Sequence, residues 1–362
     1  MPGIVKIKFI SENNRIAKSM TRPLTLISEI LPLAYDGKIL LDYYKQLYPH
    51  EWNVLVERCA NYKDKDAFLV KQGKKTRYGL TTAENFFFSL PKVKYILSKG
   101  QKDMHATSND AHTIEIKKEI FFAKRKSAIL KMQNKISNNK KNMQFIDPLF
   151  LDLYDYAYHK KGITQIEKLE IVNELFKYDT PRVVDILHKI NDAERNDQIR
   201  NLVFHHLQTN GHYVKLRKKF KGKIKPYQVE EYDYDMTPQD LVEHLDGKRL
   251  QNMKQFDMFI SHSAKDAELV REVIKNLNKK NITCYCDWIS DTDFLKRNLV
   301  SEYTKIALKR RIEQSKVFLF IKTNNSTTDD IISSPWIQLE YDYAKTISKK
   351  IYIMDLTKNK ND

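Results

Sequence analysis

The last hundred residues of the chain alternate between short apolar runs and amphipathic stretches. Buried strands are predicted at Phe256–Ser261, Ile282–Asp287, Lys316–Lys322 and Lys350–Leu356, and helices at Asp266–Leu277, Leu295–Ile312 and Pro335–Ile347. Strands that alternate with helices in this way form a parallel sheet with helices on both faces. We therefore expect an α/β domain over residues 255–362.

In such a sheet, ligands bind outside the carboxyl ends of the strands. The loops after Ile260, Cys286 and Ile321 are therefore expected to line a ligand crevice. Polar and aromatic side chains in these loops are candidates for ligand contact: Ser261, His262, Ser263, Asp287, Trp288 and Asp291. No glycine follows Gly247, which excludes a glycine-rich phosphate loop and argues against a dinucleotide fingerprint.

A single carboxylate lies beside the apolar face of the last predicted helix. That face is predicted to consist of Trp336, Leu339, Tyr343 and Ile347. Glu340 lies one turn from Trp336, and a carboxylate at the edge of an apolar face is a candidate functional group. The alternative is an acidic residue favoured near a helix start, but Glu340 lies beyond the first turn, where that benefit fades.

Several motifs of this segment occur together in one known family. They are the run Asp257-Met258-Phe259-Ile260-Ser261-His262-Ser263, the run Tyr285-Cys286-Asp287-Trp288-Ile289-Ser290-Asp291, Arg297, and Ser334-Pro335-Trp336 followed by Glu340. In this order they resemble a bacterial Toll/interleukin-1 receptor (TIR) domain, over a little more than a quarter of the chain. The resemblance implies a flavodoxin-like fold. Members of the family include scaffolds and enzymes that cleave the nicotinamide–ribose bond of NAD+.

The resemblance also implies roles for individual residues. The enzymes place a glutamate in a Trp-x-x-x-Glu context, which Trp336 and Glu340 match, so Glu340 is the expected catalytic residue. The expected substrate-binding residues are Ser261, His262, Asp287, Trp288, Asp291 and Trp336. Some family enzymes carry arginine just after the first strand, where this chain has Ser263 and Ala264, so the substrate phosphates would be contacted differently. NAD+ is expected as a substrate, with no cofactor and no metal.

The chemistry is consistent with one carboxylate. Breaking the N-glycosidic bond of NAD+ expels neutral nicotinamide from a pyridinium, so the leaving group needs no proton and the acid carboxylate of ordinary glycosidases is dispensable. The remaining carboxylate would stabilise an oxocarbenium-like ribose, and this effect grows where water is excluded. Whether water or adenine then captures the ribose, giving a linear or a cyclic product, depends on the shape of the pocket.

Each candidate ligand contact is also compatible with a purely structural role. Trp288 either stacks on an aromatic base or fills the edge of the core. Asp287 either holds a ribose hydroxyl or caps the following helix. Ser261 and His262 either contact ligand or form hydrogen bonds within their loop. Arg297 is more simply a structural partner of Asp291 or Asp293 than a phosphate contact, while Phe259 and Phe318 are most simply core residues.

The 362-residue chain is long enough for two or three domains, and its formal net charge is +17. Roughly +4 of that charge falls after residue 250, so about three-quarters of the excess lies before it. A polyanion such as nucleic acid, or a partner protein from a defence system, would therefore bind the N-terminal part. The alternative is a lysine-rich composition without a binding role.

The N-terminal part is predicted to be mainly helical, of the α or the α+β class. It is divided into an α+β region over residues 1–143, a helical bundle at 144–225 and a connector at 226–254. Within the first region we expect a strand at Ile4–Ile10, a helix at Leu24–Tyr48, a loop at Lys99–His112 and a helix at Ile114–Met143. The last helix is expected to bury Ile116, Ile120, Ala123, Ile129 and Met132. The bundle is expected to bury Leu169, Val172, Phe176, Val183, Ile186, Leu187 and Ile190. In the connector, Thr237, Pro238 and Gly247 are typical of the start and end of a short helix.

Two rival functions remain open. Arg200 and His205 fit the Arg-x4-His pattern of HEPN ribonucleases, although Ile199, Leu202, Val203 and Leu207 are expected to form the core face of that helix. His205, His206 and His212 lack companions with metal-ligand spacing. The other rival is a TIR scaffold without catalytic activity that recruits partners through its surface.

Cysteine content and hydropathy indicate the compartment. Cys59, Cys284 and Cys286 cannot form a disulfide framework, and the last two are expected to share one face of a strand. No apolar run of membrane-spanning length and no signal-peptide pattern occurs. We therefore expect a cytoplasmic protein with no membrane association, an NAD+ nucleosidase or ADP-ribosyl cyclase of bacterial antiviral defence. Similar family members become active when they self-associate, so a homo-oligomer is expected on activation.

Overall fold

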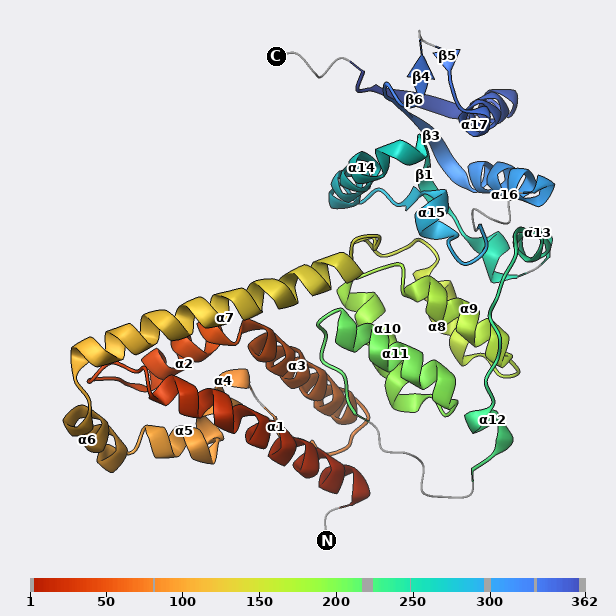
Figure 1. The fold of residues 1–362 in the computed structure, drawn as a ribbon. Coiled ribbons are helices and arrows are strands. Elements are labelled where there is room, and N and C mark those ends of the chain that lie inside the picture. The colour runs from red at the N-terminus through yellow and green to blue at the C-terminus, as the bar shows by residue number, and fades with distance from the viewer. Residues whose placement is uncertain are drawn as a thin grey trace. The chain divides into compact units, whose positions relative to one another are not determined.

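The computed structural model describes residues 3–80, 82–216, 224–247, 249–295, 301–328 and 331–357 (Figure 1). The chain divides into two compact units. The first comprises Met1–Asn139 and Leu207–Val214, and the second comprises Lys140–His206 and Lys215–Asp362. Residues 140–206 therefore belong to the same unit as the C-terminal α/β domain.

The first unit is built from helices. They are Ile4–Ser28 (α1), Gly37–Leu47 (α2), Pro49–Lys71 (α3), Ala83–Ser89 (α4), Pro91–Ile96 (α5), Lys99–Ser108 (α6) and Ala111–Asn139 (α7). Their apolar faces meet in one core, in which Leu24, Leu40, Tyr44 and Phe87 are almost completely buried. None of the described helices in the chain is long and apolar enough to span a bilayer.

Two predicted elements of this unit are wrong. The expected strand Ile4–Ile10 is the first part of α1, because only Phe9 of that segment is buried and the next buried residue, Glu12, follows at helical spacing. The expected loop Lys99–His112 contains α6, which turns His105 into the core, where its Nε2 lies 3.0 Å from the Leu31 carbonyl oxygen. A segment with a single buried residue gives too little helical periodicity for its helix to be predicted.

The predicted helix Leu24–Tyr48 is interrupted. Helix α1 ends at Ser28, and α2 begins at Gly37 with Asp36 as its N-cap, whose side chain accepts a hydrogen bond from the Ile39 amide at 2.8 Å. Pro32 lies in the break, and a proline disfavours helical conformation in the residue before it.

Helix α7 is confirmed, but its predicted buried face is wrong. Ile116 and Ile120 are 47% and 66% exposed, and Ala123 and Met132 are exposed as well. The helix instead buries Ile114 and packs Phe121 and Phe122 against the core, while Ile129 is partly buried. Apolar residues lie on more than one side of this helix, so spacing alone could not select the side that packs.

The second unit starts with the predicted helical segment. Its helices are Leu151–His159 (α8), Gln165–Leu175 (α9), Pro181–Ala193 (α10) and Asp197–Thr209 (α11), the last of which continues into the first unit. The predicted core residues are buried except Phe176, whose ring is partly exposed and stacks on His206 at 3.9 Å. The structure shows Pro226–Val229 (α12), Pro238–Asp246 (α13) and the 3-10 turn Leu250–Met253 (η1) in the following segment. The predicted cap of α13 is confirmed, since the Thr237 side chain accepts from the Asp240 amide.

The C-terminal domain contains the predicted parallel sheet. Its strands Phe256–Ser261 (β1), Cys284–Tyr285 (β2), Ser315–Lys322 (β3) and Lys350–Asp355 (β6) lie in the order β2-β1-β3-β6. The helices are Ala267–Lys279 (α14), Asp287–Ser290 (α15), Glu302–Glu313 (α16) and Pro335–Thr346 (α17), with the 3-10 turn Ala264–Asp266 (η2). Thr327–Thr328 (β4) and Ile331–Ile332 (β5) form a separate antiparallel pair.

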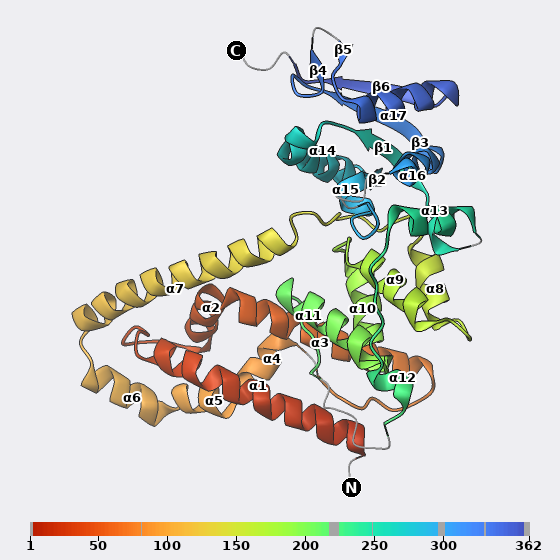
Figure 2. The ribbon, with the colours of Figure 1, turned by 45° about the vertical axis from the view of Figure 1, so that its right-hand side comes forward.

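Helices lie on both faces of this sheet (Figure 2). Ile260, Leu319 and Cys284 pack with α14 and with Ile289 of α15 on one face. Phe318 and Phe320 lie against Tyr341 of α17 on the other face. Both predicted core phenylalanines, Phe259 and Phe318, are buried, and Cys284 and Cys286 share the first face as predicted.

Strand β2 is shorter than predicted. The amides of Asp257 and Met258 both donate to the carbonyl oxygen of Thr283, so the ladder is irregular before Cys284. At the other end Asp287 begins α15. The strand therefore ends just where its polar candidate residues begin, which places them at the carboxyl edge of the sheet.

Candidate active site

Glu340 lies on the buried face of α17. The buried residues of this helix are Ile337, Glu340 and Ala344, spaced by three and four residues. The predicted apolar stripe is therefore wrong, because Leu339 and Tyr343 are partly exposed and line a surface groove beside Lys309 of α16. The helix therefore turns Glu340 toward the sheet, so that this residue lies within the packed face and not at its edge.

The partner of Glu340 is the last residue of β1. Ser261 is fully buried, and its Oγ donates a hydrogen bond of 2.6 Å to Glu340 Oε2. Side chains alternate along a strand, so Ser261 lies on the same face of the sheet as Phe259, the face that α17 covers. This parity brings the two predicted site residues together across 79 positions of sequence.

Burial sets the ionisation of this carboxyl. Glu340 is 8% exposed, and burial, followed by the negative charge of Asp287, raises its pKa from 4.5 to about 8, against an opposing contribution from the Ser261 hydrogen bond. A carboxyl with this pKa is largely protonated at neutral pH in the free protein. A positive charge placed beside it would favour the ionised form.

His262 and Trp288 come together at the neighbouring strand end. Trp288 Nε1 donates to His262 Nε2 at 2.6 Å, while His262 Nδ1 lies 3.2 Å from the carbonyl oxygen of Ile260. An acceptor at Nε2 requires the proton on Nδ1, so these partners assign the neutral Nδ1–H tautomer. The Trp288 indole also packs against the buried cluster beneath α14, and Arg271 lies 4.8 Å from its ring centre.

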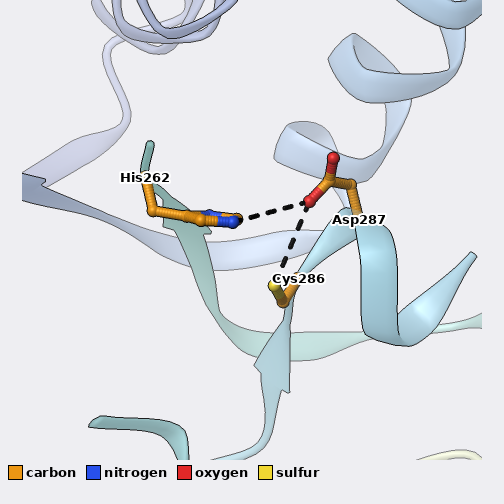
Figure 3. Close-up of side chains that lie close together, drawn as sticks. All are labelled: His262, Cys286 and Asp287. Carbon is orange, nitrogen blue, oxygen red and sulfur yellow. Dashed lines mark hydrogen bonds and ion pairs between the residues drawn. The ribbon is translucent and has the colours of Figure 1, made fainter. Parts of the chain in front are cut away.

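Figure 3 shows His262, Cys286 and Asp287, whose potential ligand atoms lie within 4.8 Å of one another. Asp287 Oδ1 is 4.0 Å from both His262 Nε2 and Cys286 Sγ. These residue types can bind a metal such as zinc. However, Trp288 occupies the Nε2 lone pair, and burial raises the pKa of the Cys286 thiol well above its usual value. The contacts therefore favour a hydrogen-bonded cluster over a metal site.

Asp291 lies in a different environment from the other predicted ligand contacts. Its carboxylate is fully buried and accepts from Arg311 Nε at 2.8 Å, from Arg311 Nη2 at 2.9 Å and from the Tyr285 hydroxyl at 3.0 Å. Burial alone would raise its pKa, but Arg311 and then Lys254 lower it to about 2. Sequence reasoning missed Arg311, although a cation between Leu308 and Ile312 on a buried helix face requires a partner of opposite charge.

Three further candidates lie at the starts of α15, α17 and η2. Asp287 lies in the first turn of α15 with 42% of its side chain exposed, and the N-cap position is Cys286. Trp336 is partly exposed in the first turn of α17. Ser263 caps η2, where its Oγ accepts from the Lys265 amide at 3.4 Å. Arg297 lies outside the described residues, and Asp293 pairs with Lys177 at 2.9 Å.

The residues of the nuclease pattern lie on α11. Arg200 is nearly buried and forms an ion pair of 2.7 Å with Asp197, whereas His205 is exposed. Ile199, Val203 and Leu207 are buried as predicted, but Leu202 is 38% exposed, contrary to the prediction. The pair with Asp197 accounts for Arg200 without a catalytic role.

Sheet order, helices on both faces and a buried carboxylate at the carboxyl end of β1 agree with the flavodoxin-like α/β domain that the resemblance to TIR domains implies. The chain is 45% identical over 357 residues to the putative cyclic ADP-D-ribose synthase TIR2 of Cytobacillus dafuensis, covering 99% of this chain and 93% of that protein. It is 30% identical over 115 residues to the probable 3' cyclic ADP-D-ribose synthase ThsB' of Bacillus cereus strain MSX-D12, covering 32% of this chain and 56% of that protein. No family model and no solved structure matches the chain. The chain belongs to the family of bacterial TIR-domain proteins.

Proposed function

We propose that this protein cleaves the nicotinamide–ribose bond of NAD+ and that Glu340 is its catalytic carboxylate. The observation that carries the proposal is the nearly complete burial of this carboxyl group, whose described hydrogen-bond partner is Ser261. A buried carboxyl with a raised pKa costs folding free energy when it ionises, and such groups cluster at functional sites. The names of the two relatives, both cyclic ADP-D-ribose synthases, support the same substrate.

In the proposed reaction the bond between the ribose anomeric carbon and the nicotinamide nitrogen breaks, and its electron pair moves onto the nitrogen. Nicotinamide leaves as a neutral molecule, and positive charge develops on the ribose. Ionised Glu340 stabilises that charge in a site where Ile337 and Ala344 flank it on the buried face of α17. Low local polarity strengthens this electrostatic interaction relative to water.

The fate of the ribose cation determines the product. A water molecule would give linear ADP-ribose and release a proton, whereas a nucleophilic atom of the same molecule would give a cyclic product. Both relatives are named as cyclising enzymes, which favours cyclic ADP-ribose. We propose Asp287 and Trp288 as substrate contacts, since they lie at the carboxyl end of β2 near His262 and since Asp287 acts electrostatically on Glu340.

The test is to incubate the purified full chain with NAD+ and to separate the products by chromatography. We expect nicotinamide and ADP-ribose, in its linear or cyclic form, in equal amounts. We further propose that activity depends on self-association and serves antiviral defence, so the assay includes a concentration series and a crowding agent that favours association. If no nicotinamide appears under any of these conditions, the scaffold function replaces the enzymatic one.

The raised pKa of Glu340 predicts how activity depends on pH. Only the ionised carboxylate stabilises the ribose cation, so kcat/KM should rise with pH and reach its half-maximal value near pH 8, the pKa in the free protein being about 8. Bound NAD+ carries a pyridinium charge that favours the carboxylate, so kcat should reach half its maximum at a lower pH than kcat/KM. Steady-state kinetics over about four pH units, from about pH 5.5 to about pH 9.5, measure both profiles. Identical, flat profiles would contradict this assignment.

A further inference from the structure

The segment Cys284–Ser290, which carries Asp287 and Trp288, is held by residues from outside the α/β domain. Two buried side chains of the preceding helical segment, Gln144 and Lys177, contact it at its two ends. Both side chains belong to the same compact unit as the sheet. The position of this segment therefore depends on two residues far earlier in the chain. Gln144 precedes β1 by more than a hundred positions and Lys177 by about eighty.

The side chain of Gln144 contacts the edge strand β2. It is 1% exposed, its Nε2 donates to the Cys284 carbonyl oxygen at 2.8 Å, and its Oε1 accepts from the Asn278 side chain at 3.3 Å. Its backbone is fixed by pairing with the Lys177–Asp179 stretch, at 2.9 Å in each direction. The same pairing therefore positions both Gln144 and Lys177.

Lys177 holds the other end of the segment. Its Nζ donates to the carbonyl oxygen of Ser290 at 2.7 Å and to Glu174 Oε2 at 2.8 Å, and it lies 2.9 Å from Asp293 Oδ2. Three acceptors match the three protons of an ammonium group, so the side chain, which is 9% exposed, has one defined position. A cation at the carboxyl end of a helix also interacts favourably with the helix dipole.

The contact with Ser290 reaches the site through a very short element. Helix α15 has four residues, Asp287–Ser290, and Ser290 Oγ also accepts from the Cys286 amide at 3.2 Å. A displacement of Ser290 should therefore also displace Asp287, because the two residues are the ends of a single helical turn. Asp287 in turn acts on Glu340 through its charge.

We infer that Lys177 and Gln144 are positioning residues for the NAD+ site, which fix α15 so that the charge of Asp287 acts on Glu340 and Trp288 bonds to His262. The inference rests on the proposed function and extends it, since it makes the helical segment at 140–206 a required part of the site. A change in that helical segment that withdrew Lys177 would alter substrate binding without touching the catalytic carboxylate.

The test is Lys177→Met in the full chain. We expect KM for NAD+ to rise about tenfold with kcat changed less than about threefold, because the displaced groups bind substrate and do not make the bond-breaking contact. The half-maximal pH of kcat/KM should fall below that of the wild type, because Asp287 no longer disfavours ionisation of Glu340. Lys177→Arg, which keeps the charge and the donors, should restore KM to within about threefold.

Lys168→Met is the matched control. Lys168 lies in the same helical segment and forms an ion pair of 3.0 Å with Glu194, remote in its contacts from α15. It should lose stability without changing KM or the pH profile. If Lys177→Met leaves KM and the pH profile at wild-type values, or if Lys168→Met shifts them equally, the inference is overturned. Gln144→Leu is the second variant, with the same expected direction, should Lys177→Met fail to fold.

A readout without catalysis separates this inference from the proposed function. The chain has three tryptophans, and the indole N–H of Trp288 is bonded to His262, so its proton resonance can be assigned with Trp288→Phe. Lys177→Met should shift that resonance, and Lys168→Met should not. If the wild type releases no nicotinamide while Lys177→Met still shifts the resonance, the enzymatic proposal is refuted and the positioning of Trp288 by Lys177 is kept. An unchanged resonance would refute the positioning role.

Discussion

We expect Glu340→Gln to reduce nicotinamide release from NAD+ by about 10³-fold in kcat, because one fixed charge that acts only on the transition state contributes on this scale. The amide preserves the shape of the side chain and a hydrogen bond to Ser261, so charge is the property removed. KM should change little, since ground-state contacts through Asp287 and Trp288 remain. The measurement is steady-state release of nicotinamide by the purified full chain.

The variant should also be well folded. The folded-state pKa of Glu340 is about 8, above its value of 4.5 when exposed, so its contribution to stability is fully present below pH 4.5 and is lost as pH rises through 8. Glutamine stays neutral throughout. Glu340→Gln should therefore melt close to the wild type at pH 5 and above it at pH 9.

Unchanged nicotinamide release by folded Glu340→Gln would exclude Glu340 from the mechanism. Ser261→Ala provides the graded comparison, since it removes the hydrogen bond that opposes the raised pKa. Its half-maximal pH for kcat/KM should move upward, with a smaller loss of activity at high pH than Glu340→Gln shows.

The C-terminal domain was predictable because its central strands β1 and β3 are largely buried and its helices are amphipathic, so that the pattern repeats. The packing of the first unit was not predictable in this way, since α7 buries Ile114 while Ile116 and Ile120 remain exposed. Its helices pack through a few large aromatic residues, such as Tyr44 and Phe87, whose ring centres are 5.3 Å apart. No spacing rule predicts which side of a helix contacts such residues.

The site was predicted unevenly for a physical reason. Glu340 and Ser261 were found from motifs and from the rule that ligands bind at strand ends, and the structure brings them together. The phase of α17 was wrong because Leu339 and Tyr343 are apolar yet face outward. Lys177 could not be found, since its contact with Ser290 joins segments 113 positions apart and leaves no local signal.

A second large effect is expected from the buried ion pair of α16. Arg311 is fully buried and all its donors have acceptors: Asp291, both the carbonyl and side-chain oxygens of Gln251, and the Gln314 side chain. Arg311→Met leaves the Asp291 carboxylate buried beside Lys254, 3.9 Å away, and the Tyr285 hydroxyl. Removing one partner of such a pair costs about 3–5 kcal/mol. Thermal melting should show a decrease on the order of 10 °C.

The neighbouring arginine provides the control for this loss. Arg310 pairs with Asp246 at 3.1 Å and with Glu313 at 3.2 Å, but 49% of its side chain is exposed, so Arg310→Met should cost less than about 1 kcal/mol. In the wild type the pKa of Asp291 is lowered to about 2, so its stabilising contribution is present above about pH 4 and is lost as pH falls through 2. Without Arg311 this carboxyl protonates more readily, and the gap between Arg311→Met and wild type should narrow as pH falls from 7 toward about 4. Equal melting temperatures for the two arginine variants at neutral pH would show that the charge of Asp291 is not held by Arg311.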